Sequence, residues 1–233
     1  VEYPTAFYGE FNADYVKLPK EVVTTPMKEH QRYFPVSKDG KLLPYFIAVR
    51  NGDKHAIDIV KAGNEKVLEA RLADALFFYD EDIKKPLESF VENLKTVVFQ
   101  AKLGTVYDKT LRIEKLAQDI VETLDEKDIL NDTLRAAKLC KADLVTNMVF
   151  EFTELQGVMG REYAKVGGEN DAVAQAIFEH YLPRFAGDIL PQTQEGVALS
   201  IADKLDSIAG FFAIGIQPTG SQDPYALRRQ ALG

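Results

Sequence analysis

The stretch Arg135–Ala164, RAAKLCKADLVTNMVFEFTELQGVMGREYA, decides how we interpret the fold. In its first half, apolar side chains recur every three or four residues, which is the period of an amphipathic α-helix. Glycines at 157 and 160 are expected to break that helix. A stripe this wide must be buried by other helices; its members are Ala137, Cys140, Leu144, Val145, Met148, Val149 and Phe152.

Helical periodicity continues on both sides of this stretch. Before it, a short helix is expected around Ala56, Ile59 and Val60, broken at Gly63, and a longer one from Val67 to about Asp82. From Pro86 onward the pattern is helical almost to the end. The further stripes are Leu87, Val91, Leu94, Val97 and Val98, then Leu111, Ile113, Leu116, Ile120 and Leu124, then Val173, Ile177 and Tyr181, and then Ala198, Ile201, Ala202, Leu205, Ile208, Ala209 and Phe212.

The first 52 residues instead carry strand and turn signals. Asp39-Gly40 between two apolar runs predicts a β-hairpin, and Thr5–Phe11 is also typical of a strand. The segment Lys41–Val49 is nearly all apolar, which predicts a strand buried on both faces with Pro44 at its edge or start. Glu21–Thr25 is compatible with either a strand or a helix. We therefore expect an α+β protein, with a mixed domain at residues 1–85 and an all-helical bundle at residues 86–233.

Composition narrows the class of protein. The 233 residues are 46% hydrophobic and carry a formal net charge of −8, which argues for a packed core and against a broad basic surface for nucleic acid. No run approaches the 18 or so apolar residues that a membrane helix needs. The single cysteine, Cys140, allows no internal disulfide. We expect a cytoplasmic protein, and a piece of a longer one.

Catalytic residues are hard to find in the sequence. A metal in the helical part would depend on His180, with Asp203 and Asp206 as the nearest acids in a helical pattern. We instead expect a hydrogen-bonded or surface histidine, and a solvated or capping role for the two carboxylates. Cys140 is expected to be a small core residue. The glycine pairs are not followed by Lys-Ser or Lys-Thr, so no phosphate-binding loop is indicated. We expect no catalytic residue and no cofactor in this chain.

Two clusters could contact nucleic acid. In Met27–Phe34, MKEHQRYF, donors alternate with aromatic rings that could stack on unpaired bases. In Gln217–Arg229 a polar turn leads into a helix at Pro224, with Asp223 as its expected cap. The alternatives are a strand edge with solvated charges and a capped helix whose arginines pair locally. The candidate tRNA-binding residues are Lys28, His30, Gln31, Arg32, Arg228 and Arg229.

Several long blocks resemble the β subunit of bacterial glycyl-tRNA synthetase. They occur in order along almost the whole chain and have no simple structural cause. The blocks are Met27–Val36, MKEHQRYFPV; Phe46–Gly52, FIAVRNG; Gly63–Ala75, GNEKVLEARLADA; Val98–Lys109, VFQAKLGTVYDK; Phe152–Ala164, FTELQGVMGREYA; and Pro218–Gly233, PTGSQDPYALRRQALG.

This resemblance implies a role in joining glycine to its tRNA, within an assembly of α and β subunits. In that family the α subunit carries the site for glycine, ATP and Mg, whereas the β subunit handles tRNA and supports the assembly. The resemblance therefore implies partners, the α subunit and the tRNA for glycine, and no reaction centre in this chain.

The helical half also resembles the His-Asp phosphohydrolase fold, which binds a divalent metal through scattered histidines and a His-Asp pair. Where that pair would follow Ala136–Leu139, this chain has Cys140 and Lys141. His180 and Asp203 are the other vestigial positions. An ammonium group repels a metal cation, so we expect the fold without the metal or the hydrolase activity.

The sequence is compatible with three functions. The first is tRNA handling within a synthetase, which the ordered blocks favour. The second is a metal-dependent phosphohydrolase, for which His180 and Asp203 would be needed. The third is an interaction module whose mixed part, residues 1–85, docks a partner subunit.

Overall fold

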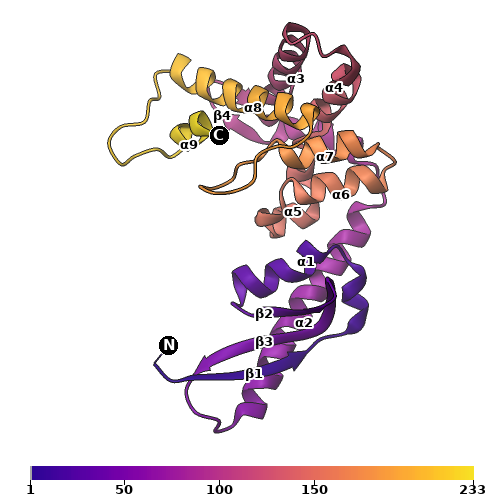
Figure 1. Cartoon of the computed structure of the whole chain (residues 1–233), viewed down its shortest axis with the longest axis vertical. Coiled ribbons are helices and arrows are strands. Elements are labelled where there is room, and N and C mark those ends of the chain that lie inside the picture. The colour runs from indigo at the N-terminus through magenta and orange to yellow at the C-terminus, as the bar shows by residue number, and fades with distance from the viewer. Residues whose placement is uncertain (1) are drawn as a thin grey trace. The chain divides into compact units, whose positions relative to one another are not determined.

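The computed structural model describes residues 2–233 of the chain. Its contacts group into two compact units, Val1–Asp82 and Ile83–Gly233. Figure 1 shows strands and helices in the first unit and mainly helices in the second. The α+β class expected from the sequence is confirmed.

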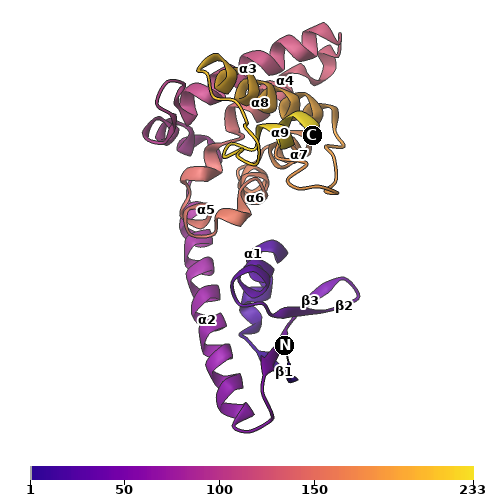
Figure 2. The same ribbon diagram turned by 90° about the vertical axis from the view of Figure 1, so that its left-hand side faces the viewer.

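The first unit is a three-stranded antiparallel sheet with helices packed against it. Strands β1 (Pro4–Glu10) and β2 (Phe34–Lys38) flank the central strand β3 (Lys41–Asn51). Helix α1 (Lys20–Thr25) settles the open choice at Glu21–Thr25 in favour of a helix. Helix α2 (Ile57–Asp82) runs along the sheet (Figure 2) and contacts β1.

The hairpin and the first strand are as predicted, but two details of β3 are not. Asp39 and Gly40 both have positive φ, as a tight two-residue hairpin turn requires. The expected burial of β3 on both faces is wrong, because Phe46 is buried while its neighbour Ile47 is exposed. Pro44 lies within the central strand and not at its edge or start. The pairing of β2 with β3 is irregular at this point, so no ladder hydrogen bond from residue 44 is required there.

The break expected at Gly63 is also wrong. Helix α2 passes through this residue without interruption, and space around it is open. A single glycine costs a long helix only about 1 kcal/mol, which the packing of Leu68 and Leu72 outweighs.

The second unit is built around helices that pack side by side. These are α3 (Val106–Thr123), α4 (Leu130–Leu139), α7 (Asp171–Glu179) and α8 (Gln194–Ala213), in which α3 contacts α4 and α8, and α7 contacts α4 and α8. Shorter helices α5 (Asn147–Glu151), α6 (Val158–Val166) and α9 (Leu227–Leu232) complete it. Before α3, a 3-10 helix at Leu87–Thr96 and strands β4 (Val98–Gln100) and β5 (Gly104–Thr105) replace the helix expected at Leu87–Val98.

Most of the apolar stripe in Arg135–Ala164 is buried as predicted, although Leu144 and Val145 are half-buried, and the first half is not one helix. The stretch consists of the end of α4, 3-10 helices at Ala142–Val145 and Thr153–Leu155, and helices α5 and α6. Thr146 caps α5 by accepting a hydrogen bond from the Val149 N–H, which forces a new helix start inside the apolar stripe. Met148 and Phe152 are nevertheless fully buried.

Candidate functional site: a buried cluster of charged side chains

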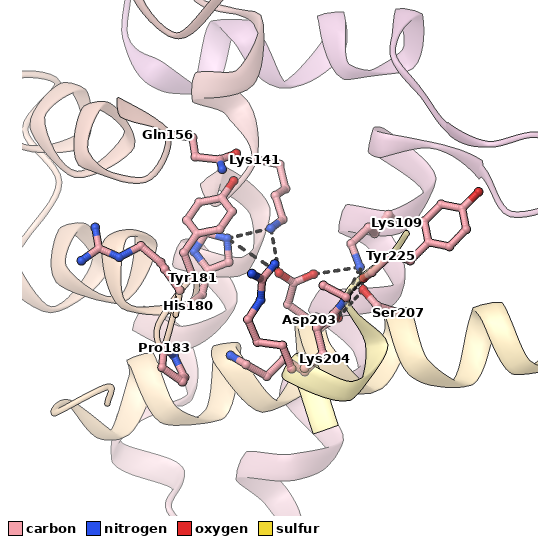
Figure 3. A pocket seen from close by; sticks show the side chains of 14 residues that line it. Lys109, Lys141, Gln156, His180, Tyr181, Pro183, Asp203, Lys204, Ser207 and Tyr225 are labelled. Carbon is pink, nitrogen blue, oxygen red and sulfur yellow. Dashed lines mark hydrogen bonds and ion pairs between the residues drawn. The ribbon is translucent and has the colours of Figure 1, made fainter. Parts of the chain in front are cut away.

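The centre of the helical unit holds charged residues brought together by four segments. Lys109 comes from α3, Lys141 follows α4, His180 caps the C-terminus of α7, and Asp203 lies on α8. Thr105 and Asp108 form a capping box that fixes the start of α3 one turn before Lys109. Figure 3 shows Lys141 and Lys109 on either side of the Asp203 carboxylate.

The Lys141 ammonium lies between His180 and Asp203. Its Nζ is 2.8 Å from His180 Nε2 and 2.7 Å from Asp203 Oδ2. His180 Nδ1 is 2.5 Å from the Ile177 carbonyl oxygen, which can only accept, so Nδ1 carries the proton and Nε2 accepts from the ammonium. Burial and the Lys141 charge both lower the pKa of His180 well below its usual value. The histidine is therefore neutral, and its hydrogen-bonded interpretation is confirmed.

Lys109 connects two carboxylates of α8, Asp203 and Asp206. Its Nζ is 2.8 Å from Asp203 Oδ1 and 2.9 Å from Asp206 Oδ2, and Arg112 Nε donates to Asp206 Oδ1 at 2.6 Å. Burial opposes the charge on Lys109, but the two aspartates outweigh it and raise its pKa. Burial likewise opposes the charge on Asp203, but Lys141 and Lys109 prevail and hold its pKa below the usual range. The solvated or capping role expected for the two aspartates is wrong, because both carboxylates are committed to ion pairs inside the bundle.

A cavity of about 300 Å³ opens beside this cluster. Its walls come from α3, α8, α9 and the segments after α4 and α7, so residues distant in sequence share one space (Figure 3). Basic and aromatic groups dominate the lining, which includes Lys109, Lys141, Tyr181, Arg184, Lys204 and Arg229.

This arrangement does not fit a divalent metal. A cation ligated by His180 and Asp203 would have to take the place of the Lys141 ammonium, which is within hydrogen-bonding distance of both. Among residues 2–233, no group of three or more His, Cys, Asp and Glu side chains is placed to hold a metal ion.

Of the four vestigial positions, the structure brings Lys141, His180 and Asp203 together and leaves Cys140 apart. The Cys140 thiol is fully buried, with its Sγ 3.2 Å from the Ala137 carbonyl oxygen. Burial raises the pKa of this thiol to about 12, so it is a core residue and not a nucleophile.

Asp143, which the sequence pattern does not single out, is buried and holds the turn at Gly157 next to this cluster. Its Oδ2 accepts hydrogen bonds from the backbone N–H groups of Gly157 at 2.6 Å and Gly160 at 3.1 Å. Burial raises the pKa of Asp143 to about 6, although these hydrogen bonds oppose the rise. Gly157 has a φ of 77°, and the Tyr181 ring occupies the space that a Cβ would need. The carboxylate thereby fixes the turn on which Tyr181 rests.

The first nucleic-acid cluster is partly buried. Pro26–His30 forms a short π-helix, so the expected strand edge begins only at Phe34. Tyr33 is buried and stacks on Phe46 with ring centroids 4.6 Å apart, which removes it from base stacking. Lys28, Arg32 and Phe34 are exposed, and His30 and Gln31 are half-buried.

In the second cluster, Gln217–Arg229, the side chains of Arg228 and Arg229 have different surroundings. Asp223 accepts hydrogen bonds from the Leu227 and Arg228 N–H groups, so its predicted capping role is confirmed, although α9 begins three residues later than expected. The Arg228 guanidinium donates to the Gly220 carbonyl at 2.7 Å. Arg229 instead lines the cavity.

Comparison with known proteins shows the family of this α+β chain. A family model described as "Glycyl-tRNA synthetase beta subunit" matches residues 1–233. The chain belongs to this family.

Relatives named glycine–tRNA ligase beta subunit match the chain throughout. That of Clostridioides difficile (strain 630) is 80% identical over 233 residues, covering 100% of this chain and 34% of its own length. Those of Desulforamulus reducens and Bacillus subtilis (strain 168) are 63% and 54% identical, each over 100% of this chain and covering 34% and 35% of their own lengths. The chain thus spans about a third of these relatives. The phosphohydrolase alternative is not supported, and likeness to the His-Asp fold stays a prediction.

Proposed function

We propose that this chain contributes tRNA binding and subunit assembly to the attachment of glycine to tRNA. The observation that carries the proposal is the family match over every residue, together with relatives whose printed name is a ligase subunit. Under this proposal the reaction centre, with ATP and Mg, lies on the partner α subunit. The protein would act in the cytoplasm as part of a hetero-oligomer. No helix described between residues 2 and 233 could cross a membrane.

We propose that the exposed part of Met27–Phe34 is the surface that binds tRNA. Lys28 and Arg32 offer charges for phosphates, and the Phe34 ring, 60% exposed, offers a stacking face. His30 and Gln31 are the neighbouring polar candidates, and Arg228 and Arg229 form the second candidate group. Each phosphate contact that is lost should flatten the salt dependence of binding by about one unit of slope.

The test is a tRNA titration of the complete subunit at several salt concentrations. The double variant Lys28→Gln with Arg32→Gln is compared with Lys84→Gln plus Lys127→Gln, which removes the same charge from the helical unit. We expect weaker binding and a flatter salt slope only for the first pair. Equal affinity and slope for both double variants would remove Lys28 and Arg32 from the contact surface.

For assembly, the open face of the sheet favours residues 1–85 as a docking surface for the partner subunit. Tyr8 and Phe34 both pair with Ile47 across the sheet, which places three exposed apolar side chains in one row. A row of this kind on a sheet face is typical of a protein interface. Co-purification of the α subunit should fall for Ile47→Thr, and should be unaffected by Val98→Thr, an equally conservative change at an exposed position of the helical unit.

A further inference from the structure

The cavity beside Asp203 has the opposite charge to the chain as a whole. The chain carries a formal net charge of −8, yet the described residues that line the cavity include five basic side chains and a single carboxylate, Asp203. Two further carboxylates pair with lining residues: Asp206 with Lys109, and Asp188 with Arg184. Such a local reversal concentrates positive potential in a partly enclosed space, which favours an anion.

Two of these cations, Lys204 and Arg229, form no ion pair with a carboxylate among the described residues. Lys204 Nζ donates to the Leu182 carbonyl at 2.7 Å and to the Ser200 hydroxyl, both of which are neutral. Burial lowers the pKa of Lys204, and the Lys141 charge adds to that effect against the attraction of Asp203. The Arg229 guanidinium makes no hydrogen bond or ion pair among the described residues, although it lines the cavity.

Tyr181 holds one of the cavity's basic groups in place. Tyr181 lines the cavity, and its buried hydroxyl has no hydrogen-bond partner among the described residues. Its ring lies under the Lys141 ammonium, with Nζ 4.1 Å from the ring centroid, which holds that ammonium at the cavity wall (Figure 3).

We propose that this cavity binds a phosphate group, held by Arg229 and Lys204 with Lys141 behind them. A phosphate has several acceptor oxygens and more than one negative charge, so it can accept from a guanidinium and an ammonium at once. A volume of about 300 Å³ is at the lower end for ligand sites, which suits a phosphate or diphosphate. The phosphate can belong to RNA or to a free nucleotide. The inference does not rest on the proposed tRNA function, because it follows from the cavity alone.

The test begins with inorganic pyrophosphate, titrated calorimetrically into the 233-residue chain at low salt. Two neighbouring variants give a matched pair, since Arg229→Gln and Arg228→Gln remove the same charge from the same helix, but only Arg229 lines the cavity. We expect binding to the wild type, a loss of about tenfold in affinity for Arg229→Gln, and little change for Arg228→Gln. No binding to the wild type, or equal losses for both variants, would overturn the proposal.

A second variant guards against local unfolding of the short helix α9. Lys204→Met retains the length of the side chain and removes its charge from α8, and circular dichroism verifies the fold. We expect pyrophosphate affinity to fall here as well, while Lys165→Met, an exposed lysine elsewhere in the unit, leaves it unchanged. Wild-type affinity in a folded Lys204→Met protein would contradict the assignment.

Competition identifies where the phosphate comes from. Pyrophosphate bound at the cavity is displaced with ATP in one arm and with a short RNA carrying a 5′-phosphate in the other. Stronger displacement by ATP than by RNA assigns a free nucleotide, and stronger displacement by the RNA assigns a nucleic-acid phosphate. Failure of both competitors to displace pyrophosphate would contradict a site for biological phosphates.

Discussion

The two units of this chain bury different kinds of side chain. The sheet unit closes mainly over apolar groups such as Phe46, Leu68 and Leu72, and most of its charges lie at the surface. The helical unit buries Lys109 and Asp206 beside its apolar core. Moving a charged group out of water has a large free-energy cost, which is offset only when the group is well paired. An apolar core would often be equally stable. The contrast predicts that stability depends on pH in the helical unit and hardly at all in the sheet unit.

The largest effect is expected from emptying the sheet unit's core. Phe46 is fully buried and packs over Gly9, so Phe46→Ala should destabilise that unit by about 3–5 kcal/mol. Because no charge is involved, denaturant unfolding should show the same loss at pH 5 and pH 8. Tyr45→Ala, one residue away on the exposed face, serves as the control and should cost much less. A strongly pH-dependent loss for Phe46→Ala would break the comparison.

In the helical unit, Asp203→Asn should cost about 3 kcal/mol at neutral pH, because it leaves two buried ammonium groups without their shared carboxylate. Since pairing lowers the folded-state pKa of Asp203, its contribution is present above about pH 4 and is lost as the pH falls below that value. Urea unfolding at pH 7 and pH 3 measures this. Asp171→Asn, which breaks an exposed pair with Lys165, should cost less than about 1 kcal/mol. A loss of equal size at both pH values would sink the ion-pair explanation.

Asp143 should show the opposite sign. Its folded-state pKa is raised to about 6, so the stability it contributes as a neutral acid is present below about pH 4 and is lost as the pH rises through 6. The shift of about two units corresponds to about 2–3 kcal/mol. We expect the stability difference between wild type and Asp143→Asn to change by about that amount between pH 4 and pH 7. A flat difference over this range would mean that the carboxyl does not titrate there.

The smallest effect is expected at the surface of the helical unit. Glu88 pairs with Arg135 and Lys138, and hydrogen bonds from these side chains lower its pKa to about 2. Its side chain is 43% exposed, so solvent screening should limit the cost of Glu88→Gln to about 1 kcal/mol. This loss of stability should disappear as the pH falls from about 4 toward 2. Thermal unfolding measures it, with Glu92→Gln, which breaks a more exposed pair with Lys95, as the control. A cost that persists at pH 2 would exclude these ion pairs as its cause.

Local chemistry explains which elements could be predicted from the sequence. Asp39-Gly40 supplies a turn with two positive φ values, and the stripes of α3 and α8 keep one helical period over many residues. Long-range contacts explain the failures. Thr146 starts a new helix within an apolar stripe, and β4 and β5 are too short to carry a pattern.

Only part of the candidate site could be predicted from the sequence. Lys141, His180 and Asp203 could be named from their positions in the sequence, but Lys109 was missed although it lies on the apolar face of α3, between Val106 and Ile113. A lysine within an apolar stripe is the signal that could have found it, since such a lysine must be paired when buried. Its partner Asp206 lies 97 residues away, a separation that no local pattern encodes.

An ammonium group, and not a metal, lies between His180 and Asp203. The most direct measurement is the metal content of the purified chain after incubation with Mn²⁺, Fe²⁺ or Zn²⁺ and removal of unbound ions. We predict no stoichiometric metal in the wild type and no difference in the His180→Ala protein. One equivalent of metal in the wild type that is lost in His180→Ala would contradict the account.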